Sequence, residues 1–498
     1  MEPPRTAEPP PPPPPPPMYE SSEDELAYVE AITAAEEHIQ RSVTPFQEVY
    51  ANSPRPVELR ENEFQPTTQQ PISTFSTDAD GASYAHARRQ ITQYGGVDPR
   101  SVRVEEFINY FDLDYPVADA RAAISLNGEV STCPWARGHQ LVRIGIQGRN
   151  LRPEERAPAN FVFLIDVSGS MAAPDKLPLL KEGFKLFVDE MGERDRVAIV
   201  TYAGRAGLAL PSTSGRAKTR IKAAIDGLGS GGSTAGAAGI LTAYEIAEAT
   251  FLAGGNNRII IGTDGDFNVG PASHEEIINL IEQKRESNIF LTVLGFGDHY
   301  NDYMLEQLAN KGNGTAEYID NASQLRKVFL YDYDKFQTVA KDVKVQVKFN
   351  PNIVASYRLI GYENRMLATE DFMDDSKDAG EIGAGQNVTA LYEIIPSNVT
   401  DVPGEAFTID FRYKEPDAIV SQPLQLKVYD RGTRFEDSSP QHQFVAGVAS
   451  FALQLRQSEY SGSATLADAR DWAMGAGVRD DHGLKQELWD LMRLAQAK

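Results

Sequence analysis

The stretch FVFLIDVSGSM, residues 161–171, decides the fold class of this chain. Its first five residues form a continuous apolar run, which is typical of a strand buried on both faces. A helical stripe of apolar residues follows, made of Leu180, Phe184, Phe187, Val188 and Met191. Strand and helix patterns then alternate as far as residue 330. This alternation predicts an α/β fold with a doubly wound, mainly parallel, Rossmann-like sheet over residues 158–330.

Polar side chains stand where the predicted strands of this unit end. They are Asp166, Ser168 and Ser170 after the first strand, Thr234 in a small-residue loop, and Asp264 after the strand predicted at 258–262. Ligands of open parallel sheets bind outside the carboxyl ends of the strands. We therefore expect these side chains to meet in one site.

All five of these residues offer hard oxygen donors, which suit Mg²⁺, Mn²⁺ or Ca²⁺ better than a soft metal. The alternate spacing of Asp166, Ser168 and Ser170 lets one loop wrap around a point and aim its side chains at it. Because two carboxylates leave a divalent cation partly unneutralised, a coordination position stays open for an anionic ligand such as a carboxylate. The alternative interpretation is a helix-capping serine with turn glycines and no metal.

This pattern resembles the metal-ion-dependent adhesion site of von Willebrand factor type A (vWA) domains. The matching pieces are DVSGS at 166–170, GST at 232–234 and TDG at 263–265. The resemblance implies that Ser168, Ser170 and Thr234 contact Mg²⁺ through their hydroxyl groups. It implies that Asp166 and Asp264 act on the metal directly or through water. It further implies that a glutamate or aspartate of a protein partner completes the ligands of the metal.

Residues beside these pieces offer weaker signals. Asp266 and Ser233 could support the ligands, although a turn or helix-capping role is favoured for Asp266. Asp175 and Lys176 could line the metal face, but a solvated helix start is the favoured interpretation. His299 follows the last predicted strand and has no nearby cysteine or second histidine, so we do not assign it a catalytic or ligand role.

The resemblance extends beyond the α/β unit to the bacterial YfbK-like group of vWA proteins. The stretches that carry it are STFSTDAD at 73–80, RVEEFINYF at 103–111, CPW at 133–135, GNNR at 255–258 and LIGYENR at 359–365. It covers roughly residues 70–495 and implies a cell-envelope location, because members typically carry a secretion or lipoprotein signal. Residues 1–6 have neither a basic nor an apolar signal region, so the chain as written is expected to be cytoplasmic. An upstream start codon that encodes a signal or a lipid anchor would instead agree with the envelope location.

Composition shifts divide the chain into five parts. They are a disordered, Pro-rich and acidic arm (1–70), an N-terminal flanking region (71–157), the vWA domain (158–330), a β-rich module (331–435) and a C-terminal helical segment (436–498). The period-two patterns of the β-rich module suggest antiparallel strands that join the strands predicted at 122–130 and 140–147. The α/β unit would then be an insert in an antiparallel β module.

Charge and composition exclude several classes of protein. The net charge is −23, and no block of lysine and arginine interrupts the acidic balance, so nucleic acid is not expected as a partner. No apolar run approaches the ~20 residues of a membrane span. The single cysteine, Cys133, excludes an intramolecular disulfide and a zinc site of several thiolates, and we expect it to be a buried apolar residue.

The function expected from the sequence is metal-dependent protein binding, in which an acidic group of a partner is captured through Mg²⁺. We find no phosphate-binding loop, no nucleophile elbow and no candidate base, so an enzyme is not expected. Two alternatives stay open. One is a metal-assisted hydrolase or a subunit of an enzyme complex, and the other is a structural domain that holds no metal.

Overall fold

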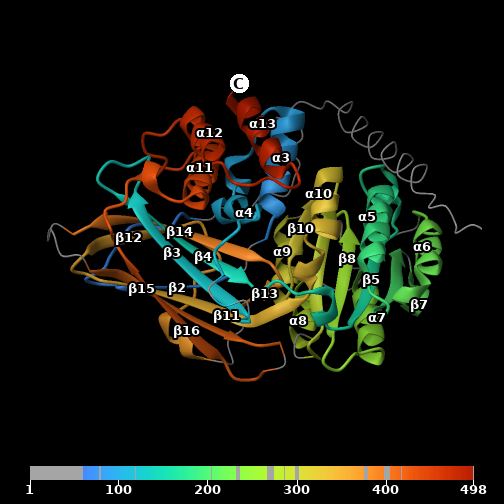
Figure 1. Cartoon of the computed structure of the whole chain (residues 1–498). Coiled ribbons are helices and arrows are strands. Elements are labelled where there is room, and N and C mark those ends of the chain that lie inside the picture. The colour runs from blue at the N-terminus through green and yellow to red at the C-terminus, as the bar shows by residue number, and fades with distance from the viewer. Residues whose placement is uncertain are drawn as a thin grey trace, which may run out of the picture.

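The computed structural model describes residues 60–77, 80–117, 119, 121–203, 205–231, 236–265, 274–284, 287–297, 302–374, 379–397, 404–416 and 418–496. Figure 1 shows an α/β unit lying beside a pair of antiparallel sheets. Helices from both ends of the described chain lie together above the junction of the two. No helix among the described residues is long and apolar enough to cross a membrane.

The α/β unit is built on one six-stranded sheet, ordered β10-β9-β8-β5-β6-β7. Its strands are β5 (Ala159–Asp166), β6 (Arg196–Ala203), β7 (Arg205–Ser214), β8 (Asn256–Thr263), β9 (Phe290–Phe296) and β10 (Ala316–Ile319). All neighbours pair in parallel except β7, which runs antiparallel to β6. β5 lies centrally, and all of its residues are buried, as the apolar run predicted.

Helices cover both faces of this sheet, which confirms the doubly wound fold. They are α5 (Leu177–Glu190), α6 (Lys218–Asp226), α7 (Gly236–Ala249), α8 (His274–Lys284), α9 (Asp302–Lys311) and α10 (Ala322–Arg326), followed by a π-helical turn at Lys327–Tyr331. The predicted stripe of α5 packs on the sheet, where Phe184 stacks on Phe163 with ring centroids 4.0 Å apart. Gly262 allows this close approach, because a Cβ there would lie 2.7 Å from Leu180.

The two antiparallel sheets combine strands from both sides of the α/β unit. One has the order β1 (Gln65–Pro66), β12 (Val354–Ile360), β14 (Asn387–Pro396), β4 (Gln140–Gly148) and β3 (Ile124–Thr132). The other has the order β13 (Gly380–Gly383), β11 (Thr338–Phe349), β15 (Glu405–Lys414) and β16 (Gln422–Tyr429), and β2 (Ile72–Ser76) also pairs with β11. The pairing of β14 with β4 confirms that the α/β unit is an insert in an antiparallel β module.

The folded chain begins earlier than the sequence suggested. Residues 60–70 were expected in the arm, yet β1 pairs with β12, and Asn62 donates hydrogen bonds to the carbonyl oxygens of Leu359 and Gly361 at 3.1 and 2.8 Å. Backbone pairing to a distant strand supplies the order that this Pro- and Gln-rich sequence lacks locally. The proline run and the rest of residues 1–59 lie outside the described residues.

The sequence patterns did not predict several short or polar elements. β10 and β13 have four residues each, which is too few to show a period. β7 contains Gly207 and Pro211, which weaken a strand signal and are tolerated because β7 lies at the sheet edge. Helix α12 (Leu466–Gly475) is short and mixes apolar with charged residues.

Segments from the two ends of the described chain form one helical cluster. It comprises α3 (Ala82–Tyr94), α4 (Val104–Asn109), α11 (Pro440–Leu455), α12 and α13 (Leu484–Gln496), which share an apolar core. Cys133 lies in that core as a free, buried thiol, and burial raises its pKa to about 12.

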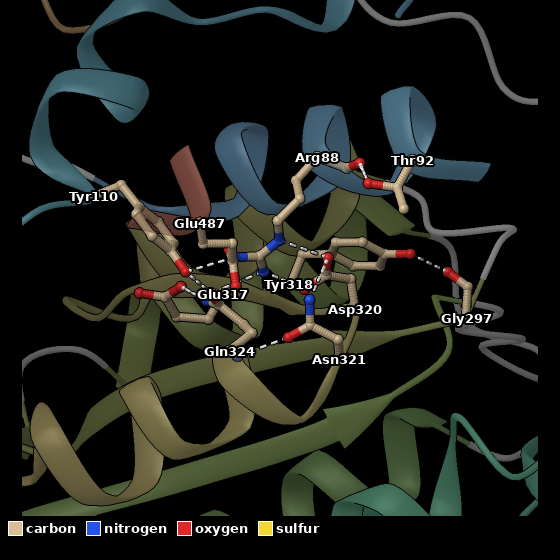
Figure 2. Close-up of polar contacts among 10 residues, drawn as sticks. All are labelled: Arg88, Thr92, Tyr110, Gly297, Glu317, Tyr318, Asp320, Asn321, Gln324 and Glu487. Carbon is tan, nitrogen blue, oxygen red and sulfur yellow. Dashed lines mark hydrogen bonds and ion pairs between the residues drawn. The ribbon is translucent and has the colours of Figure 1, made fainter. Parts of the chain in front are cut away.

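Charged side chains join this cluster to the α/β unit. Figure 2 shows Arg88 of α3 at the centre of the contact, with Asp320 and Glu487 as its two acidic partners. Its Nε donates to Asp320 Oδ2 at 2.9 Å, and its Nη1 donates to the Tyr110 hydroxyl at 2.9 Å. Arg88 and Asp320 have side chains that are only 4% and 3% exposed, so the junction is buried as well as ionic.

Candidate functional site

Two buried carboxylates stand at the carboxyl ends of neighbouring strands. Asp166 is the last residue of β5, and Asp264 follows β8 directly. The strands pair in parallel with Ile165 opposite Gly262, so both strands end at the same edge of the sheet. Asp166 is 0% exposed and Asp264 2% exposed. The sheet therefore brings the two acidic residues of the predicted site to one edge.

The loop after β5 is folded around the first carboxylate. The backbone N–H of Ser168 donates to Asp166 Oδ1 at 2.8 Å, and a 3₁₀ turn over Gly169–Ala172 follows. The Ser168 and Ser170 hydroxyl oxygens are 2.9 Å apart, and Ser170 is exposed. These hydroxyl groups therefore lie together, and the outer one is open to solvent.

The environment of Asp166 opposes its negative charge. Burial raises the pKa of Asp166 above its ordinary value, and the negative charge of Asp264 acts in the same direction. Hydrogen bonds from Ser168 and Thr263 oppose this rise, and the Thr263 hydroxyl donates to Asp166 Oδ2 at 3.3 Å. A cation close to both carboxylates would relieve this repulsion.

A cationic side chain already contacts the second carboxylate. Lys176 Nζ donates to Asp264 Oδ2 at 2.9 Å, while Asp264 Oδ1 is buried and has no hydrogen-bond partner. A buried carboxylate oxygen without a partner is costly, so this atom has an unused capacity to bind a donor or a cation. The donor set of two carboxylates and two hydroxyls fits a hard divalent cation.

A metal ion at this edge of the sheet would need hydroxyl oxygens among its ligands. Among the residues that the structure describes, no three His, Cys, Asp or Glu side chains gather in a metal-binding arrangement. Thr234, Ser233 and Asp266 lie outside the described residues, as does His299. The segment that precedes Thr234 nevertheless contacts the site, because the N–H of Gly231 donates a hydrogen bond of 2.7 Å to the carbonyl oxygen of Val167 in the serine loop.

The residues that follow the serine loop face inward, which corrects the expectation of a solvated helix start. Asp175 is 7% exposed and accepts a hydrogen bond of 3.1 Å from Arg89 of α3, and Lys176 reaches Asp264. Arg89 and Asp175 are separated by 86 residues, so no local pattern could have paired them. Thr263 was also missed as a partner of Asp166, although it directly precedes Asp264 in the sequence.

Comparisons with known families place the chain in the class that the sequence resembles. The model of the von Willebrand factor type A domain matches residues 160–330, and a second model, described as von Willebrand factor, matches residues 51–143. A third, described as the C-terminal part of the uncharacterized protein YfbK, matches residues 334–497. The α/β unit is therefore a vWA domain, and the chain is a vWA-domain protein.

Similarity to individual proteins shows to which family of vWA proteins the chain belongs. The chain is 38% identical over 461 residues to the uncharacterized protein YfbK of Escherichia coli (strain K12), covering 87% of this chain and 80% of that protein. The chain belongs to the YfbK family of vWA proteins. A protein of Mycobacterium sp. (strain KMS), described as UPF0353, is 28% identical over 236 residues, covering 41% of this chain and 69% of the relative.

One solved structure among the similar ones is a von Willebrand factor type A protein from Catenulispora acidiphila. It is 17% identical in sequence, with a TM-score of 0.45, and the match covers 74% of this chain and 96% of that one.

Proposed function

We propose that this protein is a metal-ion-dependent protein-binding module that captures an acidic group of a partner through Mg²⁺ at the edge of the vWA sheet. The observation that carries the proposal is the pair of buried carboxylates, Asp166 and Asp264, in which one oxygen of Asp264 has no partner and the other binds an ammonium group. Mn²⁺ or Ca²⁺ would suit the same oxygen donors.

The proposed ligands divide into hydroxyl and carboxylate groups. Ser168, Ser170 and Thr234 would contact the metal through their hydroxyls, and Asp166 and Asp264 would act directly or through water. The metal would supply an electrophilic position for a glutamate or aspartate of the partner. Thr263 and the backbone N–H of Ser168 hold the Asp166 carboxylate in place for this role.

We further propose that the site binds without catalysing a reaction. Asp166 is hydrogen-bonded to Ser168 and Thr263, and Asp264 is paired with Lys176. These contacts orient oxygen donors, and the Thr263 hydroxyl that donates to Asp166 is fully buried, so it is not open to attack a substrate. We expect no turnover of phosphoesters by the metal-loaded protein.

Calorimetric titration of Mg²⁺ and Mn²⁺ into chelator-treated protein tests the proposal. We expect about one equivalent of metal to bind to the unaltered chain, with at least a tenfold loss of affinity in Asp166→Ala and Thr234→Ala. Ser170→Ala offers a milder variant, because this exposed side chain contributes little to the fold. Asp226→Asn is the matched control, since its side chain is 57% exposed and belongs to the same domain.

A pull-down with acidic peptides then tests the partner. Glutamate- or aspartate-bearing peptides should be retained in the presence of Mg²⁺ and released by EDTA, and the matching glutamine and asparagine peptides should not be retained. Metal binding that is unchanged in Asp166→Ala, Thr234→Ala and Ser170→Ala would reject the proposed ligands. Phosphoester hydrolysis that disappears in Asp166→Ala would favour an enzyme instead.

A further inference from the structure

A cavity of about 80 Å³ lies where the vWA domain meets the β module and helix α4. Residues that line it include Tyr110, Arg258, Thr292, Asn313, Glu317 and Asn387. We call it the seam cavity. Arg258 lies near the start of β8 and Asp264 follows its end, so six residues of extended chain, about 20 Å, separate the cavity from the proposed metal site. Cavities between domains are frequent ligand sites.

Arg258 is a buried cation without an acidic contact. It is 5% exposed, and its guanidinium donates to the Thr292 hydroxyl at 2.8 Å and to the carbonyl oxygen of Phe336 at 3.4 Å. The rings of Phe290 and Phe336 lie 5.0 and 5.7 Å from its Cζ, and its Nε has no hydrogen-bond partner. Burial lowers the pKa of Arg258 to about 10, and the charge of Glu381, which lines the same cavity, acts in the opposite direction. A buried charge of this kind is stable only when it is paired or well hydrogen-bonded.

The other cations that line the cavity already have partners. Lys327 and Lys335 both pair with Asp332, at 2.5 and 2.7 Å, and Lys335 also pairs with Asp112 at 2.8 Å. Among the described lining residues, Arg258 is therefore the cation whose charge the protein does not match with a carboxylate contact. This difference points to an anionic group as the missing partner.

Hydrogen-bond acceptors without donors complete the lining. Asn387 is 5% exposed, and its Nδ2 donates to Asp112 Oδ1 at 3.3 Å, while its Oδ1 has no hydrogen-bond partner. The Oδ1 of Asn313 is likewise buried without a partner. Beside the carboxylates of Glu317, Asp332 and Glu381, the cavity thus offers a guanidinium with an unpartnered Nε and two amide oxygens that need a donor.

We propose that the seam cavity binds a small organic carboxylate that also carries a hydrogen-bond donor, as hydroxy acids and amino acids do. The carboxylate pairs with Arg258, and the hydroxyl or ammonium group donates to the amide oxygens of Asn313 or Asn387. A water occupies about 10–15 Å³ by the same measure of volume, so the cavity has room for roughly five to eight non-hydrogen atoms. Glycolate, lactate, glycine and alanine fall in or close to this range.

Binding to the full chain tests this site independently of the metal. Glycolate, lactate, glycine and alanine are titrated by calorimetry and in thermal unfolding, with glycolamide and ethanediol as uncharged counterparts at equal ionic strength. We expect at least one of the carboxylates to bind with one equivalent and to raise the unfolding temperature, because it bridges two parts of the fold. The uncharged counterparts should have no such effect.

Substitutions locate the binding. Arg258→Met should abolish it, and Asn313→Asp should weaken it at least tenfold, because a second carboxylate repels the ligand. Asn313 has a φ of 51°, a conformation that aspartate also tolerates, so this variant is expected to fold. Asn288→Asp is the matched control, since Asn288 has a φ of 56° and lines a neighbouring cavity, which Asn313 also borders, but not the seam cavity. Equal binding of the carboxylates by the Asn313 and Asn288 variants would overturn the proposal. It would also be overturned if no carboxylate had an effect at 10 mM, or if a crystal structure showed only ordered water at Arg258.

Discussion

The core of the vWA domain and the seam that joins it to the flanking helices are both buried, but they are stabilised in opposite ways. We define the seam by the contacts that α3, α4, α13 and the residues directly before them, together with Arg365 after β12, make with one another and with β10, α9 and α10. In the core, Phe161, Phe163, Phe184 and Phe187 pack edge to face or stacked beneath the sheet. The seam is instead ionic, as Figure 2 shows around Arg88.

Other pairs repeat this pattern along the seam. Arg103 contacts Glu306 of α9 at 2.6 Å, and Arg365 contacts Asp80 and Glu306 at 2.9 and 3.3 Å. An apolar core gains free energy in proportion to the area that is removed from water. A buried ion pair gains little net free energy, but the loss of one partner leaves a desolvated charge. The core therefore tolerates small changes of shape, and the seam should tolerate no loss of a partner.

The largest expected effect is the loss of the central arginine of the seam. Arg88→Met leaves Asp320 buried without its cation, which should lower the free energy of unfolding by about 3–5 kcal/mol. Chemical denaturation followed by circular dichroism measures this. The double variant Arg88→Met, Asp320→Asn should recover part of the loss, because no uncompensated carboxylate then remains.

An exposed ion pair provides the control for this variant. Lys222 pairs with Asp189 at 2.8 Å, and the two side chains are 33% and 50% exposed. Lys222→Met should change the free energy of unfolding by less than about 1 kcal/mol. Equal effects of Arg88→Met and Lys222→Met would remove the distinction between seam and surface.

A pH-dependent effect of intermediate size is expected at Glu363. Burial and the charge of Glu105 raise the pKa of Glu363 from 4.5 to about 7, although its carboxylate pairs with Arg456 at 2.7 Å. The folded state therefore holds a proton that the unfolded state releases, so stability falls as the pH rises from about 4.5 to about 7. At about 1.4 kcal/mol per pKa unit, the loss reaches at most about 3.5 kcal/mol.

Glu363→Gln tests this contribution directly. Because Arg456 keeps a second contact with Glu61 at 3.8 Å, its charge is not left without a partner. The variant should therefore be more stable than the unaltered chain at pH 8 and no more stable at pH 4, as measured by denaturation at several pH values. A pH dependence that is identical in the two proteins would show that Glu363 ionises normally in the folded chain.

Among the buried positions, the smallest effect is expected in the apolar core. Ile259 of β8 is 0% exposed and packs on the face of the sheet that α7, α8 and α9 cover. Ile259→Val removes one methylene group and should cost about 1 kcal/mol in the free energy of unfolding, at every pH between 5 and 8. A cost above about 3 kcal/mol would mean that the core is as intolerant as the seam.

Local sequence patterns predicted most of the architecture, for a physical reason. The apolar run at 161–165 became the central strand β5, because burial on both faces requires continuous apolar side chains. The period-two patterns at 140–147 and 388–394 became β4 and β14, and their pairing confirmed the insert. Edge and short strands such as β7 and β10 were missed, since their order comes from a neighbouring strand rather than from their own pattern.

The candidate site likewise has a part that the sequence predicted and a part that it did not. The positions of Asp166 and Asp264 at strand ends followed from the sequence, because parallel strands deliver their carboxyl ends to one edge. The contact of Lys176 with Asp264 and that of Arg89 with Asp175 did not, since each pair is more than 80 residues apart along the chain. Thr234 stays a prediction.

The sequence by itself determined the doubly wound α/β fold and the positions of Asp166 and Asp264 at strand ends, which depend on periodicity and on position within single elements. These are local properties. The vWA and YfbK families were indicated by the resemblance of short motifs. Only the tertiary structure decided which charges are partnered. Arg88 pairs with Asp320 across 232 residues, whereas Arg258 is enclosed with its Nε unpartnered. The choice of partner depends on which segments meet when the α/β unit packs against its flanks, and no local pattern encodes that meeting.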